Sequence, residues 1–181
     1  MNLKIIKKYI KSAITFFILI LLSSMLLTSC EKKVAVNLYF GKISETETYL
    51  ESDTRMISES NDFYKDVVTE IIKGPEKEGL YRTIPSSVIV NSVTLENRMA
   101  TVDLSGEIIT DNTDIPHSST TEMLAIYSIV NTLTEFEDID EVRITVEGMT
   151  SGELDGLAVE DFWGHIGIHD KFIRNEEIIA Q

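Results

Sequence analysis

Apolar and polar residues alternate along one stretch in the first quarter of the chain. In VAVNLYF, residues 34–40, every second position is Val, Leu or Phe, and a period of two predicts a β-strand. A polar stretch follows as far as Asp53. Residues 54–57 then predict a short second strand.

The next segment, residues 61–73, changes to the spacing of an amphipathic helix. Its apolar face consists of Phe63, Val67 and Ile71. Ser60 is expected to be the N-cap, whose side chain accepts a backbone N–H of the first turn. Gly74 supplies the left-handed residue that ends many helices, and Pro75 cannot continue one. The pattern therefore predicts a single helix with defined ends.

A second helix is predicted over residues 120–136. Its wide apolar face consists of Met123, Ile126, Tyr127, Val130 and Leu133. Ser119 and Glu122 have the spacing of a capping box, in which each side chain binds the backbone N–H of the other residue. We therefore expect this helix to begin directly after Ser119.

Strands are predicted on either side of the second helix. Residues 87–105 predict a β-hairpin with its turn at 96–98. The first arm is expected to point Ile89, Val93 and Leu95 to one face, and on the return arm Ala100, Val102 and Leu104 alternate with polar residues. VRITVEG, residues 142–148, predicts a last strand with Val142, Ile144 and Val146 pointing inward.

The order is therefore strand, helix, hairpin, helix, strand. Two helices with broad apolar faces and a sheet with one apolar face bury each other in two layers. This pattern predicts an α+β domain, a small sheet with two helices packed on one face.

The first part of the chain has the layout of an export signal. Lysines are frequent in residues 1–11, which contain no acidic residue, and residues 13–27 carry no charge. Leu27, Thr28 and Ser29 lead into Cys30, the single cysteine, and this segment resembles the lipobox of bacterial lipoproteins. The resemblance implies a diacylglycerol on the Cys30 sulfur and cleavage just before it. Two alternatives are an uncleaved membrane anchor over residues 12–29 and an incidental free thiol.

These boundaries divide the chain into a signal peptide (1–29), a short charged spacer after the lipidated cysteine (30–33) and one domain (34–179). Removal of the signal leaves 152 residues, with 12 basic and 30 acidic side chains and a net charge of −18. Such a charge repels nucleic acid and anionic surfaces, so the expected contact with the cell membrane is the lipid on Cys30. We expect the domain on the extracytoplasmic face.

Several residues are of types that can act as reactive or metal-binding groups. Asp103 and Ser105 lack a predicted base and are expected on the solvent face of a strand and in the turn after it. His165 and His169, with Asp170, lack an evident third zinc ligand and are expected on a surface strand; His117 is expected in a loop. The acidic run lacks the spacing of an EF-hand and is expected to be a solvated connection: Glu135, Glu137, Asp138, Asp140 and Glu141. Phe162 and Trp163 are expected in the core. We therefore expect no catalytic residue, no cofactor and no metal site.

Several segments resemble, in order, the GerM (GerMN) domain family of sporulation and spore germination lipoproteins. The matching pieces are VNLYF (36–40), IIKGP (71–75), the segment 84–108 that contains VDLS, IYSIVNTLTEF (126–136), VRITVEG (142–148) and the tail 164–177. The resemblance implies a small sheet with two helices on one face, similar to ring-building modules of sporulation secretion complexes. It supplies no catalytic residues.

The leading hypothesis is a lipid-anchored, non-catalytic interaction or assembly module in sporulation or spore germination. Its expected partners are other envelope or sporulation proteins, including further copies of itself. The alternatives are a small metal-dependent envelope hydrolase and a general cell-wall lipoprotein unrelated to spores. A solute-binding lipoprotein is disfavoured because 152 residues are few for two lobes that close on a ligand.

Overall fold

The computed structural model describes residues 13–17, which are helical, and residues 32–180. Residues 33–181 form a compact unit separate from residues 1–32, and this unit is the one described below. Within the described ranges, no helix is long and apolar enough to cross a membrane. Most of the predicted signal peptide, together with Leu27, Thr28, Ser29 and Cys30, lies outside the described residues.

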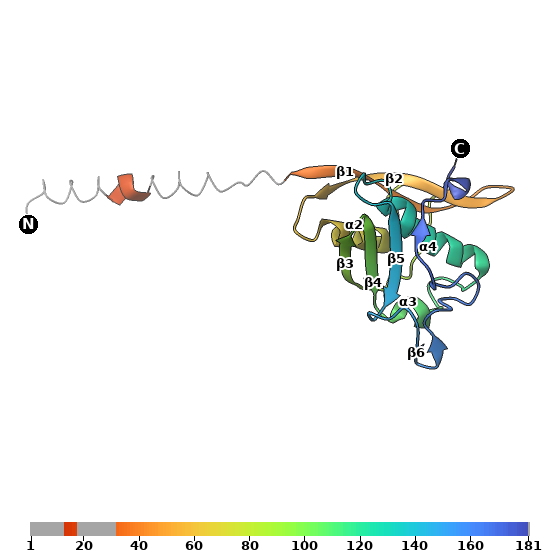
Figure 1. The fold of residues 1–181 in the computed structure, drawn as a ribbon. Coiled ribbons are helices and arrows are strands. Elements are labelled where there is room, and N and C mark those ends of the chain that lie inside the picture. Colours follow the sequence, from red (N-terminus) through yellow and green to blue (C-terminus); the bar gives the residue numbers. More distant parts are fainter. Residues whose placement is uncertain (1–12, 18–31, 181) are drawn as a thin grey trace, which may run out of the picture. The chain divides into compact units, whose positions relative to one another are not determined.

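A long hairpin begins the unit (Figure 1). β1 (Lys33–Ile43) pairs antiparallel with β2 (Thr48–Ser58), from Lys33 opposite Ser58 to Ile43 opposite Thr48. The predicted strand 34–40 is confirmed. The expected second strand of four residues is instead one of 11 residues, and it includes residues 48–53 of the stretch interpreted as merely polar.

The main sheet has four strands in the order β3-β4-β5-β8. They are β3 (Val90–Glu96), β4 (Met99–Leu104), β5 (Glu141–Val146) and β8 (Phe172–Ile173), with β4 and β5 parallel and the other pairs antiparallel. The predicted hairpin is confirmed, with Asn97 and Arg98 at φ 50° and 65° in a two-residue turn. The inward position predicted for Ile89 is wrong: it is exposed, and a register shift between Val90 and Ser92 turns Val90 inward.

Two helices each pack against both the hairpin and the main sheet. α2 (Phe63–Lys73) contacts β1 and β3, and α4 (Ser119–Leu133) contacts β1 and β5. Short elements complete the unit: α3 (Glu107–Thr110), β6 (Glu153–Leu154), β7 (Leu157–Ala158) and the 3-10 helix η1 (Glu176–Ile178). The α+β class is confirmed, and the structure adds that β1 pairs with β2 rather than with the main sheet.

The predicted helix caps need correction. α2 ends at Gly74 as expected, with φ 86°, but its N-cap is Asp62, and Ser60 lies outside the helix. For α4 the N-cap is Ser118, which forms a reciprocal capping box with Thr121. The predicted box of Ser119 and Glu122 is therefore wrong: the helix begins one residue earlier, and the Glu122 carboxylate accepts from the backbone N–H groups of residues 165–167 instead.

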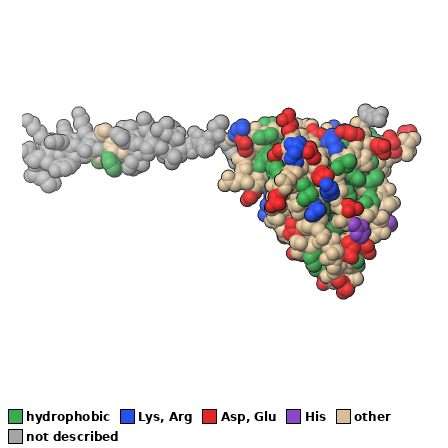
Figure 2. Space-filling model, viewed as in Figure 1, with side chains coloured by type: hydrophobic (Ala, Val, Ile, Leu, Met, Phe, Trp, Pro, Cys, Tyr) green, Lys and Arg blue, Asp and Glu red, His purple; other side chains and the backbone are tan. Residues whose placement is uncertain are grey.

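The core consists of side chains from the hairpin, the helices and the main sheet. Fully buried side chains include Leu38 and Phe40 of β1, Ile71 of α2, Ile126 and Leu133 of α4 and Ile144 of β5. Because α4 is covered on nearly all sides, even its polar residues Ser128, Asn131 and Thr132 are buried. On the face shown in Figure 2, acidic side chains extend to the lower tip, whereas basic side chains lie higher.

Candidate functional site

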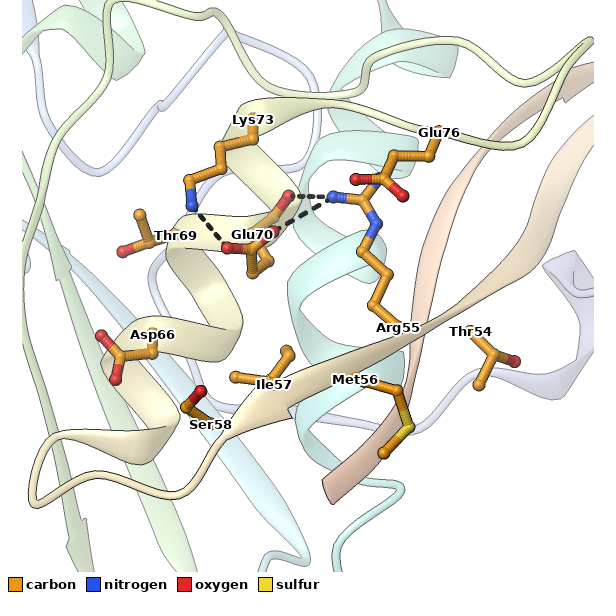
Figure 3. Close-up of a pocket in the computed structure, with 10 residues that line it drawn as sticks. All are labelled: Thr54, Arg55, Met56, Ile57, Ser58, Asp66, Thr69, Glu70, Lys73 and Glu76. Carbon is orange, nitrogen blue, oxygen red and sulfur yellow. Dashed lines mark hydrogen bonds and ion pairs between the residues drawn. The ribbon is translucent and has the colours of Figure 1, made fainter. Parts of the chain in front are cut away.

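A groove of about 420 Å³ runs along β2 where this strand faces α2 and the turn that follows it (Figure 3). We call it the edge groove. It is lined by Thr54, Arg55, Met56, Ile57, Ser58, Asp66, Thr69, Glu70, Lys73 and Glu76. One wall is therefore a strand and the other is mainly the polar face of a helix.

The helical wall follows from residue spacing in α2. Asp66, Thr69 or Glu70, and Lys73 recur every three or four residues, so they share one face. The opposite face carries the buried residues Val67, Val68, Ile71 and Ile72. The same amphipathic pattern that packs α2 against the core thus presents a charged stripe to the edge groove.

Arg55 fixes the strand wall to the end of α2. Its guanidinium forms ion pairs with Asp53 at 3.1 Å and with Glu70 at 3.2 Å, and it donates to the carbonyl oxygen of Gly74 at 2.5 Å. It also lies 5.3 Å from the ring centre of Phe40, a cation–π contact. Arg55 is only 8% exposed, so these contacts replace water around a buried charge.

Asp53 is the second buried charge at this site. Besides Arg55 it accepts hydrogen bonds from the backbone N–H groups of Glu76 at 2.8 Å and Lys77 at 3.2 Å. Burial alone would raise the pKa of Asp53, but these donors outweigh it and hold the pKa below its usual value. Asp53 therefore stays ionised and ties the turn after α2 to β2.

Two carboxylates of the edge groove have no basic partner among the described residues. Asp66 is bonded to the hydroxyl of Ser60, and Glu76 is exposed on the turn after α2. Glu70, in contrast, is neutralised by Arg55 and Lys73. The groove thus has an excess of negative charge.

Asp103 and Ser105 have structural partners. Asp103 accepts from the hydroxyl of Thr145 at 2.7 Å and the backbone N–H of Gly148 at 2.6 Å. The Ser105 hydroxyl accepts from the backbone N–H of Ile89 at 2.9 Å. Ser105 directly follows β4, as expected, and it is buried.

His165 and His169 lie in consecutive turns, not on the predicted surface strand. The loop 159–169 that carries them is held by Glu122, which is 0% exposed. The Glu122 carboxylate accepts the backbone N–H groups of His165, Ile166 and Gly167 at 2.8–3.0 Å. Within the part of the chain that the structure describes, no group of three His, Cys, Asp or Glu side chains could hold a metal ion.

Aromatic side chains stabilise the same loop. The ring of Trp163 stacks on the ring of His117, with centres 4.4 Å apart, and on the ring of Phe162, with centres 5.3 Å apart. Its indole N–H donates to the carbonyl of Ile108 at 2.6 Å. Phe162 and Trp163 are buried, as expected from the sequence. A second cavity of about 280 Å³ borders these rings and Asp161.

The acidic run after α4 forms contacts with other elements. Glu135 accepts from the Tyr39 hydroxyl and pairs with Arg174, Asp140 pairs with Arg98, and Glu141 pairs with Lys171. Asp138 accepts from the Tyr64 hydroxyl at 2.7 Å; burial and this carboxylate raise the pKa of Tyr64 to about 12. The sequence predicted only a solvated connection here. The structure shows that these carboxylates also bind side chains of other elements.

Sequence patterns did not reveal Arg55, Asp53 or Glu122 as important. One signal was present: Asp53, Arg55 and Ile57 alternate in the sequence, and all three are buried. Opposite charges two residues apart on one strand face can neutralise each other in the interior. Glu122 had no comparable signal, because its partners lie more than 40 residues away.

The Germane family, described as "Sporulation and spore germination", matches residues 37–152. The tandem GerMN domains of the sporulation protein GerM from Bacillus subtilis superpose with a TM-score of 0.63 at 21% identity. This match covers 85% of this chain and 50% of that one, so the chain spans half the length of the tandem structure.

The first GerMN domain of the same Bacillus subtilis protein gives a TM-score of 0.52 at 21% identity, over 76% of this chain and 99% of that domain. At such identities the likeness shows the fold alone. A comparison with curated proteins finds no match.

Proposed function

The chain belongs to the Germane family of sporulation and spore germination, and from this premise we propose that it is a lipid-anchored, non-catalytic assembly module of the cell envelope. In this role the domain binds another envelope protein on the extracytoplasmic face of the membrane. Two alternative hypotheses are that the partner is a second copy of the chain and that the role lies outside spores.

The observation that carries the docking role is the edge groove. It combines an exposed apolar side chain, Met56, which is 59% exposed, with a charged helix face and a strand edge. Arg55 and Asp53 link both walls of the groove through buried ion pairs and hydrogen bonds. A preformed surface loses little conformational entropy on binding.

Support for the lipid anchor comes from the sequence. Leu27, Thr28 and Ser29 before Cys30 resemble a lipobox, and the spacer up to β1 is short. An anchored domain is confined near the membrane, and this raises its effective concentration toward partners held there. Weak docking contacts can then be sufficient.

The lipid anchor is tested by Cys30→Ala in sporulating cells, with Thr28→Ser, which retains a small residue, as the matched control. We expect Cys30→Ala to accumulate as the longer precursor without incorporated lipid, whereas Thr28→Ser matures normally. Immunoblots of membrane fractions and metabolic labelling with a radioactive fatty acid measure both. Normal maturation and labelling of Cys30→Ala would exclude the anchor.

Docking is tested by a photo-crosslinking amino acid at Met56, compared with the same amino acid at Ile89, which is similarly exposed, at 63%, but lies outside the groove. Crosslinks are followed through growth, sporulation and germination. We expect a discrete product from position 56 during sporulation or germination, identified by mass spectrometry as an envelope protein. Equal products from both positions, or none at any stage, would contradict docking at the groove.

A further inference from the structure

The backbone of β2 is unpaired along the edge groove. In an antiparallel pair, the N–H and C=O of each residue point together to one side, and neighbouring residues point to opposite sides. Gly41 exchanges hydrogen bonds with Tyr81, away from β2, and its partner in register is Leu50. Even-numbered residues of β2 therefore direct their backbone groups away from β1.

Two contacts confirm this direction and limit the length of the free edge. The carbonyl of Leu50 accepts from the N–H of Ala180, and the carbonyl of Ser52 accepts from the Lys77 ammonium at 3.3 Å. Beyond Ser52, the outward backbone groups of Thr54, Met56 and Ser58 form no hydrogen bond with the rest of the described chain. The free edge is thus the stretch that lines the groove.

We propose that the edge groove binds its partner by strand addition, taking an extended segment with lysine or arginine at alternate positions. The main chain of this segment pairs with Thr54, Met56 and Ser58, as in other cases of β-augmentation. This inference rests on the proposed docking function and specifies the chemistry of the partner.

The alternation of the added strand follows from the pleat. Residues directly opposite Met56 would share its solvent-exposed face, where an apolar side chain can cover it. The residues between them would share the face of Arg55 and Ile57 and extend toward the charged stripe of α2. There Asp66 and Glu76 have no basic partner among the described residues, and this favours cationic side chains.

The same charges disfavour a second copy as the occupant. The full chain has a formal net charge of −14, and pairing of two β2 edges would place two acidic grooves against each other. Like charges at such a contact oppose association.

The experiment uses the full chain purified in detergent micelles and three labelled synthetic peptides. One alternates valine and lysine, one alternates valine and glutamate, and one repeats the lysine peptide with N-methylated backbone amides that cannot pair. Fluorescence anisotropy measures affinity, and hydrogen exchange measures protection of the Thr54, Met56 and Ser58 amides. We expect the lysine peptide to bind about tenfold or more tightly than either control, about 1.4 kcal/mol, and to slow exchange at these amides.

A proline pair provides the matched variants. Met56→Pro removes an outward N–H from the groove edge, and Ala35→Pro removes the outward N–H of the residue opposite it on β1, at the other edge of the hairpin. Proline is tolerated on edge strands where its missing N–H was unpaired. We expect Met56→Pro to abolish peptide binding and Ala35→Pro to retain it.

A charge variant keeps the test decisive if Met56→Pro does not fold. Glu76→Lys changes an exposed side chain and should weaken binding of the lysine peptide while strengthening binding of the glutamate peptide. Equal binding of all three peptides, or binding without amide protection, would overturn strand addition. If crosslinks from position 56 persist in that case, docking at the groove stands and only the strand mechanism falls; if both fail, both proposals fall.

Discussion

Arg55 and Glu122 are both buried charged residues, but their surroundings differ. Arg55 is held by two carboxylates and a backbone carbonyl beside an open groove. Glu122 forms no ion pair with another described residue and is held by three backbone N–H groups of a closed loop. The first arrangement joins two elements and leaves a strand edge exposed, whereas the second fixes the path of an irregular segment.

This difference shows how each charge contributes to the molecule. Loop 159–169 has few regular backbone hydrogen bonds of its own, so a carboxylate replaces them. The backbone of β2 pairs regularly with β1 and needs no such replacement. There Arg55 compensates the charges of Asp53 and Glu70. Removing Glu122 should therefore disrupt backbone structure, while removing Arg55 should mainly loosen packing between α2 and β2.

The largest effect is expected from Glu122→Ala. Three backbone N–H groups lose a fully buried acceptor, and the free energy of unfolding should fall by about 4 kcal/mol. Urea unfolding followed by circular dichroism measures this loss, with Glu137→Ala, at an exposed position, as the control. A loss below about 1 kcal/mol would show that water replaces the carboxylate and that the loop does not depend on it.

A smaller loss, about 3 kcal/mol, is expected from Arg55→Met, because Asp53 keeps two backbone donors when its cation is removed. Lys73→Met, which changes only the exposed partner of Glu70, is the control and should cost less than about 1 kcal/mol. Chemical unfolding measures both variants. If they lose the same stability, the distinction between buried and exposed partners is wrong.

The pH dependence of stability should report Asp53. Its pKa is lower in the folded protein than in the unfolded chain, so its contribution is present above the unfolded value, about 3.9, and is lost as pH falls through the folded value. The stability difference between the protein and Asp53→Asn should therefore shrink as pH falls below about 4. A difference that stays constant across that range would contradict the role of the carboxylate charge.

The smallest effect on stability is expected from Met56→Ser. Met56 is 59% exposed, so the free energy of unfolding should change by less than about 0.5 kcal/mol. Binding of the valine and lysine peptide should nevertheless weaken several-fold, because an apolar contact of the groove is lost. Unchanged peptide affinity would show that Met56 does not contribute to the docking surface.

Local patterns predicted the elements whose partners lie close in the chain. The spacing of Phe63, Val67 and Ile71 predicted α2, and Gly74 ends it through a left-handed backbone. Asn97 and Arg98 form the hairpin turn where the alternation of neighbouring residues placed it. In these cases the determining interactions span a few residues, so composition and period were sufficient.

Tertiary contacts decided the rest. Residues 48–53 of β2 were missed because they are mostly polar and include Asp53, a buried charge that only the contact with Arg55 in the folded chain compensates. The cap of α4 lies at Ser118 because Ser118 and Thr121 bind each other's backbone N–H groups, and the Glu122 carboxylate instead holds a distant loop.

By itself, therefore, the sequence determined the α+β class, the elements set by local periodicity and the family likeness, all of which depend on short-range order or on residue identity. Only the tertiary structure decided which charges are buried, which strand edge stays open and where a groove forms. These features depend on the distances between groups far apart in the chain, and no local pattern encodes such distances.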